Sequence, residues 1–488
     1  MLHPANHHRN NDKTAMDQWS LSNLDEYPRA KKSKQESKKK LRCHITKSSS
    51  TKGNWEMLPA AVVDNVFKYL KFNDVKSASS ACRNWRHGLY HPRLWQHVRF
   101  EISEKSLQRS RYLRNMVGHM VTDATVVFGS MSKDCIEEFL ALLECFTFSN
   151  QLQSLMLKPS HCHVLHPDET KWQETEQQLI ELFMKITEEK SMTRLSFGCL
   201  EQLQQKVIDI LHHLANVKPD KITTLGLATV KDDPSNYLLN YYDPQLITPF
   251  QNLEILSVDY DVLTDLFLDG LKNCRNLNRL VVHVHGVWDG HPGTSENAWK
   301  NFKEQHPDCR LRLSLIHAFD EVAVMHNTIL RDNMPLSHLR VLFCEGLNII
   351  VLEKLLMYKD TFVSLSWVDC VDMDSRYNLI QSDTPPNIIM LAWLCNKLEE
   401  MRIIGYKFFD QDWIGVAKLR SNTLKKLEIS STDILDSDLN FNIFIELPLI
   451  LGKSCKILNR YDLHPVFLDN SSADSDEYLL PILLADLQ

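Results

Sequence analysis

The feature that most constrains the fold of this chain is an apolar motif of the form L-x-x-L-x-L, which recurs about ten times after residue 150. Each motif alternates aliphatic and variable residues, as a short β-strand with one buried face does. The motifs begin at or near Leu152, Met192, Ile222, Leu253, Leu277, Leu311, Leu339, Phe362, Leu398 and Leu424. Recurrence at intervals far longer than a strand needs predicts a stack of repeated units.

The spacing of these motifs resembles that of leucine-rich repeats. Starts at residues 222, 253 and 277 are 31 and 24 residues apart, whereas the 40 residues between the first two starts indicate an insertion. Helical periodicity fills the gaps, since residues 175–188 place Leu179, Phe183 and Ile186 on one face. Strand and helix in alternation predict a curved, irregular α/β solenoid. The uneven spacing leaves open an irregular α/β domain whose aliphatic triplets only imitate repeats.

The concave face of such a solenoid offers candidate recognition residues. Side chains of a strand alternate between the two faces of the sheet, so residues between the matched aliphatics face outward. The substrate-binding candidates selected in this way are Lys158, Asp259, His283, Glu345, Arg402 and Glu428. Their mixed charge suits a protein or peptide, although each position can also be a solvated polar residue, because few residues in an interface carry its binding energy.

A separate unit of structure precedes the repeats and begins at Asn54. Pro59 suits the first turn of a helix, and Asp74 can cap a second one. The residues that follow the i, i+3, i+4, i+7 pattern of the first helix are Val63, Val66, Phe67 and Leu70. A third segment brings Leu94 and Trp95 to the same small core. Three short helices bury too little apolar surface to be stable alone, so they need a neighbouring domain or a partner.

In order and spacing, residues 54–98 resemble an F-box. The matching residues are Leu58, Pro59, Val63, Val66, Phe67, Leu70, Asp74, Cys82, Arg83, Trp85, Leu94 and Trp95. The chain departs from the pattern at Phe72, where proline is common, and at Ala78 and Ala81, where larger aliphatic residues are usual. These departures leave the register of the match intact, although they could weaken docking.

The resemblance implies a function and a set of partners. F-box proteins dock on the S-phase-kinase-associated adaptor, which joins them to the cullin and RING subunits of an SCF ubiquitin ligase. The adaptor-binding residues implied for this chain are Leu58, Pro59, Val63, Val66, Phe67, Leu70, Trp85 and Trp95. The same stripe is the core of a three-helix bundle, so several of these residues are expected to serve both purposes.

We therefore expect a substrate-recognition subunit that binds a protein target for ubiquitination and proteasomal degradation. No cysteine stands beside a recognisable base in a known motif, so we expect no catalytic residue of its own and no cofactor. One alternative is an F-box scaffold that takes no part in ubiquitin transfer. A second alternative is a nuclear factor that binds nucleic acid through a basic arm.

That basic arm is residues 1–53, which hold twelve Lys and Arg against five Asp and Glu and too few apolar residues to fold. Two clusters between residues 29 and 42 resemble a two-part nuclear-import signal. The import-signal candidates are Lys31, Lys32, Lys38, Lys39 and Lys40. A solvated basic tail is the other interpretation. The remaining chain carries a net charge of −14, which does not suit a broad nucleic-acid surface.

Two clusters of histidines contain the side-chain types that bind metal ions. His161-Cys-His-Val-Leu-His166 packs four possible ligands into six residues, and His283, His285 and His291 lie near Asp289. Neither cluster has the two separated pairs of a structural zinc site, so we expect no metal.

The cysteines and the ends of the chain bear on its location and its domains. Twelve cysteines, none in a C-x-x-C pair, indicate reduced thiols and a cytoplasmic or nuclear protein. The longest apolar runs, such as residues 388–394 and 478–485, are far shorter than the ~20 residues that cross a bilayer, so we expect no membrane association. The expected domains are the arm (1–53), the F-box (54–98), the repeats (99–468) and an acidic, then apolar, tail (469–488). We expect the tail to be an acidic linker that leads into a capping strand or helix.

Overall fold

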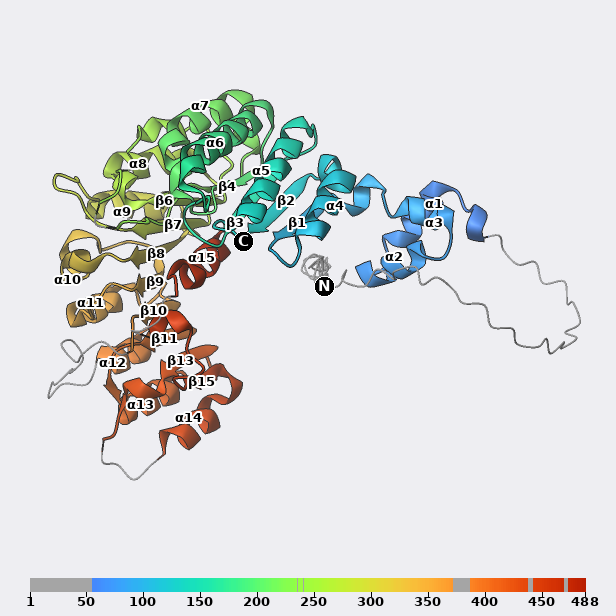
Figure 1. Ribbon diagram of the computed structural model, residues 1–488. Helices are drawn as coiled ribbons and strands as arrows, with labels where there is room; N and C mark the ends of the chain where they lie inside the picture. The colour runs from blue at the N-terminus through green and yellow to red at the C-terminus, as the bar shows by residue number, and fades with distance from the viewer. Residues whose placement is uncertain (1–54, 235, 240, 372–386, 438–441, 469–472) are drawn as a thin grey trace, which may run out of the picture.

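A computed structural model describes residues 55–234, 236–239, 241–371, 387–437, 442–468 and 473–488. It contains a small three-helix unit, a long curved sheet covered on its outer side by helices, and a final helix on the inner side of the curve (Figure 1). The expected basic arm and its five import-signal lysines lie outside the described residues. None of the described helices is long and apolar enough to span a lipid bilayer.

The three-helix unit packs around a small apolar core. Its helices are α1 (Ala60–Phe67), α2 (Phe72–Ser79) and α3 (Arg83–Gly88), preceded by a 3-10 turn at Trp55–Met57 and followed by another at Pro92–Leu94. Val63, Phe67 and Val75 are buried in its centre, and Trp85 meets the Phe67 ring edge to face at 5.9 Å. Gly88 permits this packing, because a Cβ there would lie 2.9 Å from a Val63 methyl carbon.

The curved sheet has thirteen strands that lie side by side in chain order, and every neighbouring pair is parallel. They are β1 (His97–Ile102), β2 (Asp123–Phe128), β3 (Ser154–Pro159), β4 (Arg194–Ser196), β5 (Thr224–Gly226), β6 (Ile255–Asp259), β7 (Arg279–Val284), β8 (Arg310–Ile316), β9 (Leu336–Leu342), β10 (Ser364–Val368), β11 (Glu400–Ile404), β13 (Lys426–Ser430) and β15 (Cys455–Leu458). β12 (Phe408–Phe409) and β14 (Ile434–Leu435) form a separate parallel pair. One strand per repeat, in chain order, is the arrangement of a solenoid.

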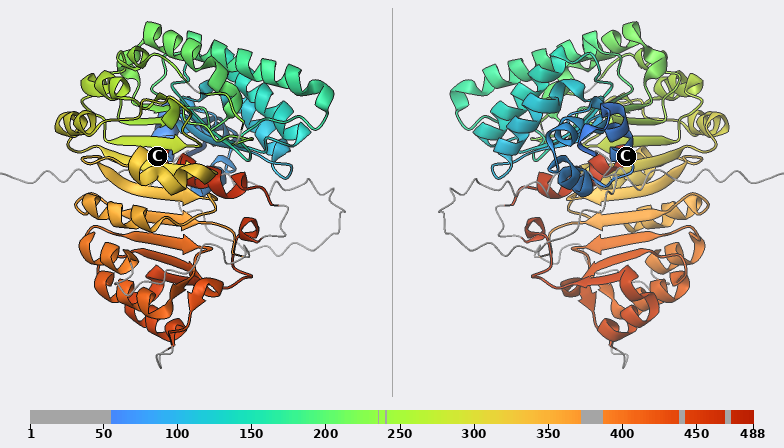
Figure 2. Two further views of the ribbon diagram at one scale, coloured as in Figure 1. Left: turned by 90° about the vertical axis from the view of Figure 1, so that its left-hand side faces the viewer. Right: turned by 90° about the vertical axis from the view of Figure 1, so that its right-hand side faces the viewer.

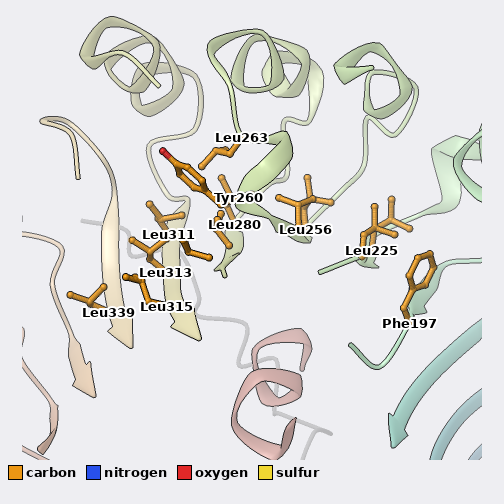
Figure 3. Packing of buried hydrophobic residues seen from close by; sticks show 14 of the residues in the cluster. Phe197, Leu225, Leu256, Tyr260, Leu263, Leu280, Leu311, Leu313, Leu315 and Leu339 are labelled. Carbon is orange, nitrogen blue, oxygen red and sulfur yellow. The ribbon is translucent and has the colours of Figure 1, made fainter. Parts of the chain in front are cut away.

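Helices cover the outer face of this sheet (Figures 1 and 2). They are α4 (Leu107–Val117), α5 (Lys133–Phe148), α6 (Trp172–Glu189), α7 (Val207–Val217), α8 (Asp265–Gly270), α9 (Glu296–Gln305), α10 (Phe319–Thr328), α11 (Ile349–Lys354), α12 (Asn387–Leu394), α13 (Asp410–Arg420) and α14 (Ile443–Leu451). The motif leucines fill the space between sheet and helices, as Leu225, Leu256, Leu280 and Leu313 do in Figure 3. The predicted leucine-rich-repeat-like solenoid is therefore confirmed.

The last helix, α15 (Asp476–Leu484), continues into a 3-10 turn at Ala485–Leu487. It lies against the inner face of the sheet instead of capping the end of the solenoid, so the capping role expected for the tail is wrong (Figure 1). Leu479, Leu483 and Leu487 are buried against inner-face residues that include Ile316 and Leu342. We call residues 473–488 the strap. It joins repeats that are far apart in the sequence.

Candidate functional site

The strap is held on the inner face by a cluster of arginines. Asp486 is fully buried, and its carboxylate accepts hydrogen bonds from Arg312 and from Arg340, whose Nη2 lies 2.9 Å from Asp486 Oδ1. Burial raises the pKa of Asp486, but the two guanidinium groups outweigh it and hold the pKa at about 2. Opposite charge at this distance stabilises the ionised form.

Two further arginines hold the backbone of the strap. Arg279 Nη1 donates to the backbone oxygens of Asp486, at 2.5 Å, and of Gln488, at 2.9 Å. Arg194 Nη2 donates to the backbone oxygen of Leu487 at 3.2 Å. We call Arg194, Arg279, Arg312 and Arg340 the arginine pocket. It binds both a side-chain carboxylate and the chain that carries it.

A charged row crosses the inner face from β9 to β15. The register places Arg340, Ser366, Arg402, Glu428 and Lys456 at paired positions of successive strands. Arg402 Nε donates to Glu428 Oε2 at 2.5 Å, and the Arg402 guanidinium also donates to the Tyr478 hydroxyl of the strap. Burial raises the pKa of Glu428, but Arg402 and Lys426 outweigh this effect and bring the pKa below its usual value.

Two of the predicted recognition residues are not available to a target. Asp259 and His283 are each 1% exposed, so their assignment to an open concave surface is wrong. Asp259 accepts from the backbone N–H and the hydroxyl of Thr229, at 2.9 and 2.8 Å, and His283 Nδ1 lies 3.0 Å from the Thr229 carbonyl oxygen. They stabilise the loop after β5.

The other predicted recognition residues differ in exposure. Glu345 is exposed on the loop after β9, where its φ is 52° and its N–H donates to Asp369 at 2.7 Å. Lys158 is half-buried on β3, and burial together with Arg99 and Arg194 lowers its pKa. Arg402 and Glu428 face the inner side but are already paired with each other. Fewer of the predicted recognition residues are therefore open to a target on the inner face than the sequence predicted.

A second candidate site lies on the three-helix unit, where large apolar side chains face solvent. Trp55 is 65% exposed, Met57 75%, Val62 41% and Tyr69 89%. Several large exposed apolar groups on so small a unit make it a candidate surface for binding another protein. Their backbone is fixed, because Trp85 Nε1 donates to the Trp55 oxygen at 2.8 Å and Asn84 donates to the Leu58 oxygen at 2.7 Å.

A family model described as F-box-like matches residues 55–101, the segment that forms this unit. The chain carries an F-box. F-box only protein 33 of Homo sapiens is 22% identical over 447 residues, which cover 77% of each chain. The Mus musculus protein of the same name is 21% identical and covers 81% of this chain and 82% of its own. F-box/LRR-repeat protein 21 of Bos taurus is 35% identical over 71 residues, 14% of this chain and 16% of its own.

Two solved structures were found to be similar to this chain. One is an internalin, inlF, of Listeria monocytogenes, with a TM-score of 0.27, 12% identity, and coverage of 71% of this chain and 94% of that chain. The other is TLR13 in a complex with ssRNA13, with a TM-score of 0.27, 14% identity, and coverage of 77% of this chain and 55% of that chain.

F-box proteins generally serve as non-catalytic adaptors for substrate recognition in SCF complexes.

The structure divides the eight predicted adaptor-binding residues into two groups. Val63, Phe67 and Trp95 are at most 5% exposed, so their assignment to direct adaptor contact in the folded chain is wrong. Val63 and Phe67 form the interior of the F-box, and Trp95 belongs to the core of the repeats. Pro59 is exposed, and the half-buried members are Leu58, Val66, Leu70 and Trp85. Sequence reasoning missed Met57, Val62 and Tyr69, because their positions fall outside the helical stripe that it took as the contact.

The F-box is joined to the solenoid through apolar contacts. Trp95 belongs to the large core of the repeats, and its Nε1 donates to the Leu89 oxygen at 2.6 Å. Leu89 and Leu94 contact both this core and the small core of the F-box. Tyr90 and Tyr112 add a hydroxyl hydrogen bond of 2.8 Å. Shared packing of this kind fixes the direction in which the solenoid extends from the F-box.

Sequence reasoning also missed the arginine pocket. Arg312 and Arg340 stand between motif aliphatics, as in Leu311-Arg-Leu313, so period-two alternation could have placed them on the inner face. The signal that the sequence did not carry is their partner. Asp486 is 146 residues from Arg340 along the chain.

Proposed function

We propose that this chain is the substrate-recognition subunit of an SCF ubiquitin ligase and delivers a bound protein for ubiquitination and proteasomal degradation. The observation that carries the proposal is the combination of an exposed apolar surface on the F-box with a shared core that joins the F-box to the solenoid. A receptor needs both features, because a target must be held at a fixed distance from the charged ubiquitin that it receives.

Docking would use the exposed side of the F-box. Pro59, Val62 and Tyr69 are exposed and can contact a partner while Val63 and Phe67 stay buried inside the F-box. A few apolar anchors carry most of the energy of an interface of this kind. The partner would be the S-phase-kinase-associated adaptor, which F-boxes bind. The adaptor would in turn connect the chain to the cullin and RING subunits.

Target binding would use the inner face that the strap leaves open. Lys456 at the β15 end of the row is exposed, and so is Glu345 on the loop after β9, whereas Arg340 and Arg402 already contact the strap. Such a surface suits a peptide segment with charges of both signs. The chain would act by proximity, because holding a target lysine next to a reactive thioester raises its effective concentration.

The basic arm would set the location of the chain. We propose that residues 29–42 direct nuclear import, so that the protein works in nucleus and cytoplasm. Deletion of residues 1–53 should abolish nuclear accumulation and leave adaptor binding unchanged. Loss of a salt-sensitive affinity for nucleic acid upon this deletion would favour a phosphate-binding role instead.

The test of the receptor function is the pair of changes Leu58→Ala and Pro59→Ala. These residues lie at the surface or half-buried, so the double variant should keep the solenoid folded and lose copurification of adaptor and cullin. Truncation of one anchor commonly costs about 2 kcal/mol, so two should weaken binding well over tenfold. A bound protein whose amount rises both in cells with the double variant and in cells treated with a proteasome inhibitor would be the degraded target.

The matched control is Tyr461→Ala, which removes another aromatic ring that is 98% exposed but lies far from the F-box in the sequence. Adaptor and cullin should copurify with this control as they do with the unaltered chain. Retention of cullin by the Leu58→Ala, Pro59→Ala variant would refute the docking surface. Adaptor binding without any ubiquitinated partner would favour the scaffold that takes no part in ubiquitin transfer.

A further inference from the structure

The arginine pocket gathers four cationic side chains around one buried carboxylate. Four guanidinium groups converge on the last turn of the strap, and the Asp486 carboxylate contacts two of them. Asp123 lies 3.8 Å from Arg194 at the edge of the cluster. Burial and the nearby Arg312 and Arg340 lower the pKa of Arg279, whereas Asp486 raises it. The contacts of Arg312 and Arg340 with the buried carboxylate show that the pocket accepts an anion.

The contacts of the pocket are those of a peptide site and not of a simple ion site. Arg312 and Arg340 bind the carboxylate, whereas Arg279 and Arg194 bind backbone oxygens of residues 486, 487 and 488. Contacts with backbone oxygens do not depend on the identity of the peptide's side chains. A different peptide with an acidic residue at the place of Asp486 could therefore make the same contacts with the four arginines.

The strap has two parts that are held differently. Helix α15 buries Leu479, Leu480, Leu483 and Leu484 against the inner face, which is a large apolar contact. The last turn depends mainly on Asp486 and Leu487. The last turn can therefore leave while α15 stays in place. Its departure would leave buried guanidinium groups unpaired, so exchange for another anion is far less costly than an empty pocket.

We propose that the arginine pocket is the anion-binding subsite for targets, occupied in cis by Asp486 until an acidic or phosphorylated residue of a target peptide replaces it. The proposal rests on the receptor function proposed above, which it makes more specific. Arginine suits both ligands, because its planar guanidinium binds carboxylate and phosphate oxygens in pairs. The two sources share one chemistry, an extended peptide with an anionic side chain.

The test measures binding of three labelled peptides to the full chain by fluorescence anisotropy. Each peptide carries the sequence of residues 485–488, since α15 keeps its own place on the inner face, with aspartate, asparagine or phosphoserine at the position of Asp486. The unaltered chain should bind the aspartate peptide weakly, because its own Asp486 competes. The Asp486→Asn chain should bind that peptide about tenfold or more tightly, and the asparagine peptide should bind neither chain. Tighter binding of the phosphoserine peptide would identify phosphorylated targets, and tighter binding of the aspartate peptide would identify acidic ones.

Two further variants in the Asp486→Asn chain locate the site. Arg340→Gln should abolish peptide binding, whereas Arg99→Gln, which changes a β1 arginine paired with Glu101, should leave it intact. Equal affinity for the aspartate and asparagine peptides, or binding that survives Arg340→Gln, would overturn the proposal.

A third variant covers loss of folding. If circular dichroism shows that Asp486→Asn unfolds the chain, Leu487→Ala loosens the last turn without a change of charge, and the same peptides are measured on it. Absence of the aspartate preference there also overturns the proposal. Adaptor copurification is scored in parallel. Its loss concerns the receptor function alone, whereas loss of peptide binding with adaptor retained concerns the pocket alone.

Discussion

Leu487 lies over Gly226 so closely that a Cβ at position 226 would stand 2.5 Å from Leu487 Cδ1. Gly226 is the last residue of β5, and Leu487 belongs to the final turn of the strap. The glycine therefore provides the space in which the last turn sits. A contact this close ties the strap to one repeat in the middle of the solenoid.

The first prediction follows from this contact. Gly226→Ala should destabilise the chain by about 1–3 kcal/mol, because the added methyl group forces Leu487 out of its position. The measurement is the free energy of unfolding in urea. Leu487→Ala removes the obstructing methyl groups, so the double variant should be more stable than the sum of the two single effects predicts. Strict additivity would show that the two side chains do not meet.

The second prediction concerns Asp486 and acid. Its folded-state pKa of about 2 lies below the value of an unfolded aspartate, so the ionised carboxylate stabilises the fold above about pH 4. That contribution is lost as the pH falls from about 4 toward 2. The unfolding free energies of the unaltered chain and of Asp486→Asn should therefore differ at neutral pH and converge as the pH falls from about 4 toward 2. At pH 7 the variant should be less stable by about 3 kcal/mol, because it leaves buried arginines without their anion. A constant difference across this pH range would contradict the assignment.

The third prediction separates the interior of the F-box from its surface with two aromatic residues of one helical segment. Phe67 is 1% exposed and Tyr69 is 89% exposed. Phe67→Ala should cost about 3–5 kcal/mol of F-box stability and lose adaptor binding as a consequence. Tyr69→Ala should leave the melting temperature unchanged and weaken adaptor affinity only. Calorimetric titration with purified adaptor, together with thermal melts, measures both effects. Equal effects of the two changes on stability would refute this division.

The sequence predicted the repeats because their strands use leucine at regular offsets. It missed β1 and β2, because these strands do not follow the L-x-x-L-x-L form. β1 buries Val98, Phe100 and Ile102, and β2 buries Ala124 and Val126. The F-box was predicted from order and spacing alone. Its surface was not, because helical periodicity identifies the buried stripe, and Val63 and Phe67 belong to that stripe.

The inner face was predicted only in part, for a physical reason. Alternation along a strand indicates which side chains leave the core, but it does not indicate what covers them afterwards. Asp259 and His283 are covered by the loop that contains Thr229, and Arg402 by Tyr478 of the strap. Contacts between residues so far apart in the chain leave no local pattern.

The last prediction concerns His338, which lies on β9 beside the arginine pocket. Burial, together with Arg312 and Arg340, lowers its pKa to about 3. An unfolded histidine binds a proton near pH 6.5, whereas the folded one stays neutral, so acidification below about pH 6.5 favours the unfolded state. His338→Gln removes this linkage. Between pH 7 and pH 5, the unaltered chain should lose about 2 kcal/mol more stability than the variant.

Chemical denaturation at several pH values measures this difference, and His87→Gln provides the matched control. His87 is exposed on α3, so its replacement should leave the slope of stability against pH as it is in the unaltered chain. A His338→Gln chain with an unchanged slope would show that the folded and unfolded chains hold the His338 proton equally well. In that case burial beside Arg312 and Arg340 would not lower the pKa of His338, and the assignment would be wrong.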